Sequence, residues 1–394
     1  MEYMPTIRFE PSNNAQGYTY EPSGAALTAV IASHPNAKWI IGNEPDSTAQ
    51  DSLTPETYAR AYNELYHLIK GQDPNAQILA GSIVQATAIR LEYLDRVLVS
   101  YQDQFNEPLP ADGWSIHNYI LREMSCDYDP FSCWGARIPP GIDAPFGELW
   151  GFRDHDRLDI FAERIVRFRQ WMASRGYRGQ PLYLTEYGVL FTPIYADEDE
   201  NVFTIERVNN YMTATFDYMN TATDMQLGNP NDGYRLVQQW SWFSTTDDNF
   251  GGTMFTRDLG PPITYTRTGI GDHYADYIAS NATAVTDFYP SHISGFASTE
   301  PGVPVTVTVS ATIANSGSLV QPITATVGLF DGDPDNGGTL LATPETVILS
   351  GCGDNQTVTA QWPDLQPGTH ELYVQVTPGS SYPDTNPANN IASS

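Results

Sequence analysis

The sequence predicts an α/β domain that is followed by a smaller all-β domain. Residues 3–280 alternate strand-like apolar runs with helical stripes, and those runs are apolar throughout instead of at every second position. Such runs are typical of parallel strands that are buried on both faces. After residue 285 short β-branched segments with Gly, Pro and Asn turns replace the helical pattern. We therefore place the domains at 1–284 and 285–394, and a chain of 394 residues is long enough for both.

The first domain alternates six strands with six helices. The predicted strands are 4–10 (MPTIRFE), 38–44 (KWIIGNE), 77–84 (QILAGSIV), 113–120 (GWSIHNYI), 181–190 (PLYLTEYGVL) and 234–244 (YRLVQQWSWFS). The predicted helices are 23–35, 54–74, 87–103, 157–175, 204–222 and 271–279. The clearest of them is 54–74: Thr54 is its N-cap, Pro55 is in its first turn, and an apolar stripe follows at Tyr58, Ala61, Tyr62, Leu65 and Ile69.

This alternation fits both an open doubly wound sheet and a closed barrel. A nucleotide-binding open sheet needs a glycine-rich turn after its first strand, and the sequence has none there. Polar and aromatic residues gather instead at the C-terminal ends of several strands, where barrel enzymes keep their active sites. We therefore expect an eight-stranded (β/α) barrel. Only six strands are present, so we expect its first two βα units to be missing from this chain.

Composition excludes several classes of partner. The net charge is −28, and only two of the 19 basic residues are lysines, so nucleic acid and anionic membranes are not expected partners. No apolar run is long enough for a transmembrane helix, and no signal peptide is visible. Aromatic residues make up 12% of the chain, which suits flat ligands such as sugar rings. Three cysteines, with no histidine at ligand spacing, do not suggest a metal site, and we expect no cofactor.

Two of the cysteines, Cys126 and Cys133, lie in one loop-like segment, SCDYDPFSCWG. They are close enough to form a small disulfide ring, which would indicate an oxidising compartment. Two separate thiols are the alternative.

Two glutamates stand at the ends of predicted strands. Glu44 follows an apolar run in KWIIGNEPD, and Glu186 follows another in PLYLTEYG. Between them, His117 and Tyr119 share one face of a strand. Paired carboxylates suit glycosidic cleavage, in which one acid gives a proton to the leaving oxygen and the other attacks the anomeric carbon. Alternatively, Glu44 could cap a helix or pair with Arg8.

At these residues the sequence resembles clan A of the retaining glycoside hydrolases, a (β/α)8 superfamily. The clan carries Asn-Glu at the end of strand four, matched here by GNEP with Asn43 and Glu44. Its nucleophile ends strand seven, matched by TEYG with Glu186. The resemblance implies that Glu44 is the general acid/base, that Glu186 is the nucleophile and that Asn43 contacts the sugar 2-hydroxyl.

Two further elements extend the resemblance over residues 3–280. The clan's His-x-Tyr element is matched by His117 and Tyr119, with Tyr119 expected to hydrogen-bond Glu186. Its strand-eight tryptophan is matched by Trp242. The chain departs from the clan at its N-terminus: strands one and two, and the arginine that often supports the nucleophile from strand two, have no counterpart.

The second domain resembles the CARDB-type immunoglobulin-like domains of bacterial surface and secreted proteins. The resemblance rests on SATIANSGSL, GLFDGDPDNGG and TNPANN. It implies a sandwich that acts as a spacer or adhesive module and that could attach the protein to a cell surface. A secreted or cell-surface, bacterial extracellular location is expected.

A long insert at residues 121–156 follows the strand that carries His117. Loops at this end of a barrel surround the active site, and this one carries Trp134 and Trp150. We expect the insert to form a wall of the sugar-binding cleft, with a Cys126–Cys133 bridge near its base. The alternative is a surface flap that only covers apolar positions of the barrel.

Two functions follow from these observations. The first is a retaining glycosidase that hydrolyses O-glycosidic bonds of a polysaccharide or glycoside by double displacement. The second is a non-catalytic carbohydrate-binding or adhesive surface protein on a degenerate barrel. The missing strands and the appended sandwich motivate the second hypothesis.

Overall fold

The structure is a computed structural model that describes residues 4–131, 133–281, 283–297, 305–319, 321–351, 353–365, 370–379 and 382–393. The chain divides into two compact units, the first ending at Tyr277 and the second beginning at Ile278. The division falls a few residues before the predicted boundary, within helix α6 (Gly269–Asn281).

The first unit is built on a seven-stranded sheet. Its order is β2-β1-β3-β4-β5-β6-β7, and every neighbouring pair is parallel except β1 and β2. The strands are β1 (Thr6–Pro11), β2 (Tyr18–Glu21), β3 (Lys38–Ile41), β4 (Gln77–Ile83), β5 (Gly113–His117), β6 (Leu182–Tyr187) and β7 (Gln239–Trp242). The sequence predicts that these strands are buried on both faces. In β3–β5 the following residues are indeed buried: Trp39, Ile41, Leu79, Trp114 and Ile116.

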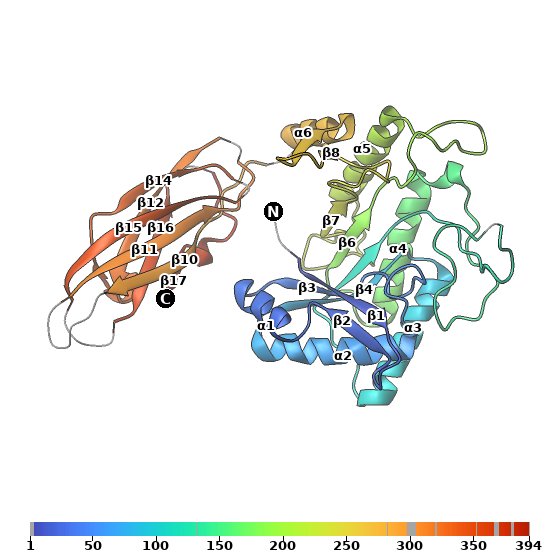
Figure 1. The fold of residues 1–394 in the computed structure, drawn as a ribbon, viewed down its shortest axis with the longest axis horizontal. Helices are drawn as coiled ribbons and strands as arrows, with labels where there is room; N and C mark the ends of the chain where they lie inside the picture. Colours follow the sequence, from blue (N-terminus) through green and yellow to red (C-terminus); the bar gives the residue numbers. More distant parts are fainter. Residues whose placement is uncertain are drawn as a thin grey trace. The chain divides into compact units, whose positions relative to one another are not determined.

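Helices α2–α5 form an arc around the outer side of these strands (Figure 1). The remaining helix bounds are α1 (Gly24–Ser33), α2 (Pro55–Gln72), α3 (Ala88–Phe105), α4 (Leu158–Ser174) and α5 (Ile205–Thr221). The N-cap of α2 is confirmed, because the Thr54 side chain accepts from the Thr57 N–H. Its predicted stripe is buried throughout. The alternation of strands and helices is therefore confirmed.

The sheet is not closed into a barrel. Among the strands that the structure describes, no pairing joins β7 back to β1 or β2. Parallel strands in sequential order are what a barrel requires, and an open sheet is what the expected loss of the first two βα units would leave, but the barrel itself is not confirmed. The two edges carry polar groups: Ser241 on β7 is exposed, and so are Thr19 and Glu21 on β2. Charged and polar residues at a free edge hinder pairing with another chain.

Three short strands of the first unit were not predicted. One is β2, which pairs antiparallel with β1, and the others form the hairpin of β8 (Phe255–Asp258) and β9 (Thr264–Arg267). The hairpin is almost wholly exposed and its strands have four residues each, so its sequence lacks the apolar run by which a buried strand is recognised.

The second unit is a two-sheet β-sandwich, as predicted from its alternating segments. One sheet has the order β10-β11-β15, and the other has β13-β12-β16-β17, with β14 also paired to β12. Residues from both sheets share one core, including Val309, Val327, Val358 and Val374. The strands are β10 (Phe288–Ala297), β11 (Val305–Asn315), β12 (Ile323–Asp331), β13 (Thr339–Leu340), β14 (Glu345–Leu349), β15 (Asp354–Leu365), β16 (Leu372–Pro378) and β17 (Ile391–Ser393).

Candidate active site

Glu44 lies in the turn that follows β3. Its backbone is in the left-handed region at φ 50°, which is unfavourable for a residue with a Cβ atom. Hydrogen bonds on both sides hold this conformation: the Glu44 N–H donates to the Ser82 carbonyl at 2.9 Å, and the Asn43 N–H donates to Asp51 Oδ2 at 2.7 Å. The side chain is only 10% exposed. A strained, anchored backbone of this kind is often found at functional sites.

Glu186 lies near the end of β6, beside His117 at the end of β5. The two residues are register partners in the parallel pair of strands. The phenol of Tyr119 donates to Glu186 Oε1 at 2.7 Å. The Glu186 side chain keeps 26% of its surface exposed, so the carboxylate is reachable from solvent.

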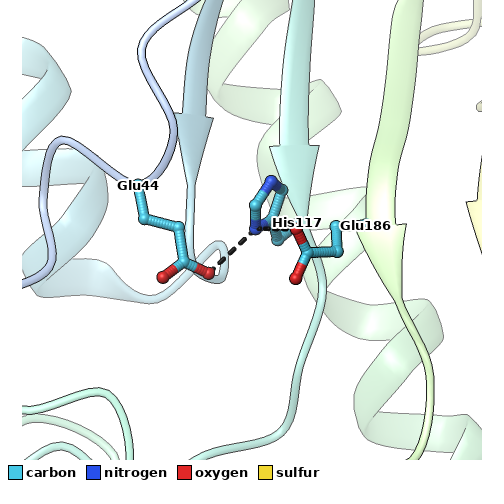
Figure 2. A group of neighbouring side chains, drawn as sticks. All are labelled: Glu44, His117 and Glu186. Atoms are coloured by element: carbon cyan, nitrogen blue, oxygen red, sulfur yellow. Dashed lines mark hydrogen bonds and ion pairs between the residues drawn. The ribbon is translucent and has the colours of Figure 1, made fainter. Parts of the chain in front are cut away.

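His117 lies between the two carboxylates (Figure 2). Its Nδ1 is 2.9 Å from Glu44 Oε1 and 3.7 Å from Glu186 Oε2. One oxygen of each glutamate and the histidine nitrogen all lie within 4.8 Å of one another. The structure thus brings together four residues that the sequence singled out: Glu44, His117, Tyr119 and Glu186.

The surroundings fix the protonation of His117 and Tyr119. Burial favours neutral His117, but the Glu186 and Glu44 carboxylates outweigh burial and raise its pKa above the usual value. Burial, reinforced by Glu186, raises the pKa of Tyr119 well above that of a free phenol. Tyr119 therefore stays protonated and keeps donating to Glu186, while His117 tends toward its cationic form.

The same three side chains have the donor types of a metal site. Two carboxylates and one imidazole within 4.8 Å could ligate a divalent cation. The short Glu44–His117 hydrogen bond already occupies His117 Nδ1, and binding a metal there would require that bond to break. The hydrogen-bonded arrangement accounts for the geometry without an ion, and the absence of a metal or cofactor stays a prediction.

Trp242 does not join this site. Its ring packs in the core against Tyr187, Tyr211 and Phe216, and its Nε1 donates to the Gly252 carbonyl at 2.8 Å. The expected stacking of Trp242 on a sugar is therefore at odds with its position, because β7 turns this side chain toward α5.

Phe243, which directly follows β7, is the aromatic residue at this end of the strand that reaches the site. Phe243 follows Trp242 directly, and alternation along the strand turns it to the opposite side. Its ring meets Tyr119 edge-on with 6.3 Å between the ring centroids. Sequence reasoning missed Phe243, although its position one residue beyond Trp242 was the signal for it.

The insert carries the expected disulfide. Cys126 and Cys133 are bonded, so the bridge is confirmed over the alternative of two separate thiols. Trp134 stacks on Phe152 with ring centroids 4.5 Å apart. Trp150 donates from Nε1 to Glu148 at 2.6 Å and packs against the core of the first unit. Both tryptophans are half-buried and already have partners within the protein.

Phe152 also links the insert to the segment that follows β6. Its ring meets Phe191 with centroids 4.5 Å apart and stacks over Tyr195. Phe191 lies five residues after Glu186 in sequence. The insert is thus packed against the loop that leaves the strand of Glu186.

Two buried arginines behind the site were also missed. Arg90 pairs with Asp46 and Glu123, and Arg164 pairs with Glu148 and donates to the Tyr119 carbonyl. Arg90 lies on the buried stripe of α3 with Tyr93, Leu94, Val97 and Tyr101. An arginine on an otherwise apolar stripe was a visible signal, because a buried charge must have partners.

No family model matches the sequence, and no curated protein matches it. Solved structures similar to the chain include a GH128 endo-β-1,3-glucanase from Amycolatopsis mediterranei (13% identity, 64% of this chain and 76% of that chain, TM-score 0.38). β-Glucuronidase 2 of Bacteroides uniformis is another (12%, 91% and 33%, TM-score 0.30). The CARDB domain of a Pyrococcus furiosus protein is a third (20%, 29% and 93%, TM-score 0.22).

The neighbours thus include glycoside hydrolases and a CARDB domain, and this chain spans about a third of the glucuronidase. Every one of these TM-scores is below 0.5, so the neighbours do not assign a function to the side chains of the site. Within the described part of the chain, no helix has both the length and the apolar character that crossing a bilayer demands.

Proposed function

We propose that the protein is a retaining glycoside hydrolase that cleaves O-glycosidic bonds of a polysaccharide or glycoside. The observation that carries the proposal is the pair of carboxylates, Glu44 and Glu186, with one oxygen of each within 4.8 Å of the other. Retaining enzymes hold their two carboxyl groups about 5–5.5 Å apart, whereas inverting enzymes need about 6.5–9.5 Å to admit a water molecule. The short separation supports double displacement.

In the first step, the Glu186 carboxylate attacks the anomeric carbon while the bond to the leaving oxygen breaks. Glu44, which is more buried, gives its proton to that oxygen. Tyr119 donates to Glu186 Oε1, which leaves Oε2 as the attacking oxygen and holds the carboxylate in place. The product of this step is a glycosyl ester of Glu186 and a free alcohol.

In the second step, the Glu44 carboxylate takes a proton from water, and the resulting hydroxide attacks the anomeric carbon. The ester bond to Glu186 breaks and restores its carboxylate, so two inversions retain the configuration. His117, between the two glutamates, stabilises whichever carboxylate is ionised at each stage. Asn43, beside Glu44, is the proposed contact to the 2-hydroxyl.

Azide rescue of two variants tests these roles. The panel consists of 2,4-dinitrophenyl β-glycosides of glucose, galactose, mannose, xylose and glucuronic acid. Glu186→Ala should lose turnover, and added azide should restore it with the α-glycosyl azide as the product. Glu44→Ala with azide should instead give the β-glycosyl azide as the product. Glu163→Ala, a change on the exposed face of α4, is the matched control and should keep full turnover. Full turnover by Glu186→Ala would refute the proposal.

The stereochemistry of the wild-type product tests the mechanism separately. Proton NMR of a fresh reaction should show the β-anomer of the product first. An α-anomer as the first product would mean inversion, and the two carboxylates would then act as general acid and general base.

One observation favours a non-catalytic function. The described strands leave the sheet open between β2 and β7, whereas a barrel enzyme surrounds its site on all sides. A carbohydrate-binding or adhesive protein would tolerate this opening. If the wild type turns over substrate and Glu186→Ala binds sugar without turnover, this second function is excluded. If the wild type and Glu186→Ala bind sugar equally and neither shows turnover, it is favoured.

We also propose that the protein works outside the cell, as a secreted or cell-surface protein. The Cys126–Cys133 bridge supports this, because disulfides persist in oxidising compartments. The sandwich would serve as a spacer or an attachment module. Thiol titration of protein purified from the cytoplasm and from the periplasm of a bacterial host would test the location: only the periplasmic form should contain the bridge.

A further inference from the structure

Arg90 uses its whole guanidinium group inside the protein. The side chain is fully buried. Its Nε donates to Glu123 Oε1 at 2.7 Å, and its Nη2 donates to the carbonyls of Ala136 and Arg137 at 2.6 and 2.9 Å. Its Nη1 donates to the carbonyl of Asp46 at 3.0 Å and also binds the Asp46 carboxylate. A charged group that is buried this completely is stable only with all of its donors paired.

These contacts join two segments that are far apart in the sequence. Asp46 belongs to the turn after β3, two residues beyond Glu44. Glu123, Ala136 and Arg137 belong to the insert after β5. Glu123 extends the connection, because its Oε2 accepts the Glu148 N–H at 3.0 Å. Arg90 is therefore the point at which the insert and the Glu44 turn are fastened together.

The Glu44 turn needs such support. Glu44 has a left-handed backbone, and a conformation of this kind persists only where its surroundings determine it. Asp46 is held at its carbonyl and its carboxylate by Arg90, and its carboxylate also accepts the Val84 N–H at 3.2 Å. With one end of the turn fixed in this way, the Glu44 carboxyl group points at His117.

We infer that Arg90 is a positioning residue for the proton-donating step, and that through it the insert sets the geometry of Glu44. This inference rests on the proposed function. Proton transfer requires a heavy-atom approach of about 2.6–3.2 Å, so a small displacement of Glu44 lowers its efficiency as an acid. The attack by Glu186 does not depend on Arg90, because Glu186 is held from β6 and by Tyr119.

Substrates with different leaving groups separate this role from a structural one. A 2,4-dinitrophenyl glycoside leaves without a proton, whereas a phenyl glycoside of the same sugar needs one. For the sugar of the panel that turns over fastest, Arg90→Lys should lower kcat/KM on the phenyl glycoside about tenfold or more. On the 2,4-dinitrophenyl glycoside the fall should be no more than about threefold. Glu44→Ala is the reference variant: its fall in kcat/KM on the phenyl glycoside, relative to that on the 2,4-dinitrophenyl glycoside, should be larger than that of Arg90→Lys.

Arg169→Lys is the matched control. Arg169 is also fully buried, but it binds the carbonyls of Leu236 and Gln180 at the opposite end of the strands. Its substitution should affect both leaving groups by the same factor. An equal fall on both substrates in Arg90→Lys would overturn the inference, because loss of stability alone acts equally on both.

Hydrogen exchange gives a readout that does not require turnover. Arg90→Lys should speed amide exchange in residues 43–53 and in residues 122–137 together, with β6 unchanged, whereas Arg169→Lys should leave both segments unchanged. Glu123→Gln, which keeps the shape of the contact but removes its charge, should reproduce the effect in a weaker form. Exchange that rises in the insert alone would overturn the coupling.

The two proposals fail in different ways. If Glu44→Ala and Glu186→Ala retain full turnover, the glycosidase function is wrong. If both variants lose turnover while Arg90→Lys shows no leaving-group selectivity, only the role of Arg90 is wrong.

Discussion

The phenol of Tyr119 donates a 2.7 Å hydrogen bond to Glu186. The two residues are 67 positions apart in sequence, and the parallel pairing of β5 with β6 brings them together. Because burial and Glu186 raise the pKa of Tyr119, the phenol remains a donor over the whole working range of pH. One oxygen of Glu186 is thereby held, and the other is the attacking atom in the proposed mechanism.

Tyr119→Phe should therefore lower kcat about a hundredfold or more, the cost of losing one oriented donor in an active site. The KM should change little, because the ring remains. Tyr187→Phe is the control: this residue, on β6, has its hydroxyl 3.4 Å from Thr215 in the core. Steady-state kinetics on the 2,4-dinitrophenyl glycoside provide the measurement. Equal kcat values for Tyr119→Phe and wild type would contradict the assigned orientation of Glu186.

Trp242 and Phe243 are neighbours with opposite surroundings. Trp242→Ala should lower the free energy of unfolding by about 3–5 kcal/mol, because it empties a core position and leaves the Gly252 carbonyl without its donor. Phe243→Ala should instead raise KM, since its ring borders Tyr119. Urea unfolding and kinetics on both variants test the pair. A raised KM with unchanged stability in Trp242→Ala would restore the sugar-stacking role to Trp242.

The Cys126–Cys133 bridge should stabilise the insert locally. Its loop is short, with a sequence separation of 7, so the chain-entropy contribution is about 2 kcal/mol. The double variant Cys126→Ser/Cys133→Ser should exchange amide protons faster in residues 124–136 and keep its turnover of small aryl glycosides. A complete loss of that turnover would show that the bridge, and not only the Arg90 contacts, holds the site.

His155 should make stability depend on pH. It is buried, Nε2 accepts the Leu190 N–H at 3.0 Å, and Nδ1 therefore donates to the Ile120 carbonyl at 3.0 Å. Burial lowers the pKa of His155 to about 4. The unfolded chain, with a histidine pKa of about 6.5, binds more protons between these two values. The contribution of neutral, buried His155 to the free energy of unfolding is complete above pH 6.5 and is lost as the pH falls toward 4.

The size of this effect is up to about 3 kcal/mol, from the difference between the two pKa values. Urea unfolding of wild type and His155→Gln at pH 7.5, 5.5 and 4.5 should show a steeper decline for wild type. His67→Gln, at an exposed position on α2, is the control and should follow wild type. The same pH slope in His155→Gln as in wild type would contradict a neutral, buried His155.

Trp134 and Trp150 test whether the insert contacts substrate. Trp134→Ala should raise KM for long oligosaccharides more than for short ones, since its half-buried ring keeps surface for a sugar. Trp150→Ala should mainly lower stability, because its N–H and ring are already bound within the fold. If both variants leave the KM for long and short substrates unchanged, the insert is only a cover.

The order of elements in the first unit was predictable because periodicity is a local property. Continuous apolar runs marked β3, β4 and β5, and a capped apolar stripe marked α2. The strand β2 and the hairpin β8–β9 carry no continuous apolar run, and a strand of four residues is too short for alternation alone to set it apart from a loop. Closure of the sheet depends on pairing between strands that are distant in the chain, and the described strands leave it open.

The sequence by itself determined which residues come together at the candidate site. Glu44, His117, Tyr119 and Glu186 lie at or just beyond the ends of their strands, and the carboxyl ends of parallel strands meet at one edge of a sheet, so their convergence followed from position along the chain. Only the tertiary structure decided that Trp242 packs toward α5 while Phe243 reaches Tyr119. It also decided that Arg90 binds Asp46 and Glu123. Alternation along a strand shows which residues share a face, but only packing decides which of the two faces meets the helices. The partners of a buried charge such as Arg90 lie far away in the sequence, so only the folded structure shows which they are.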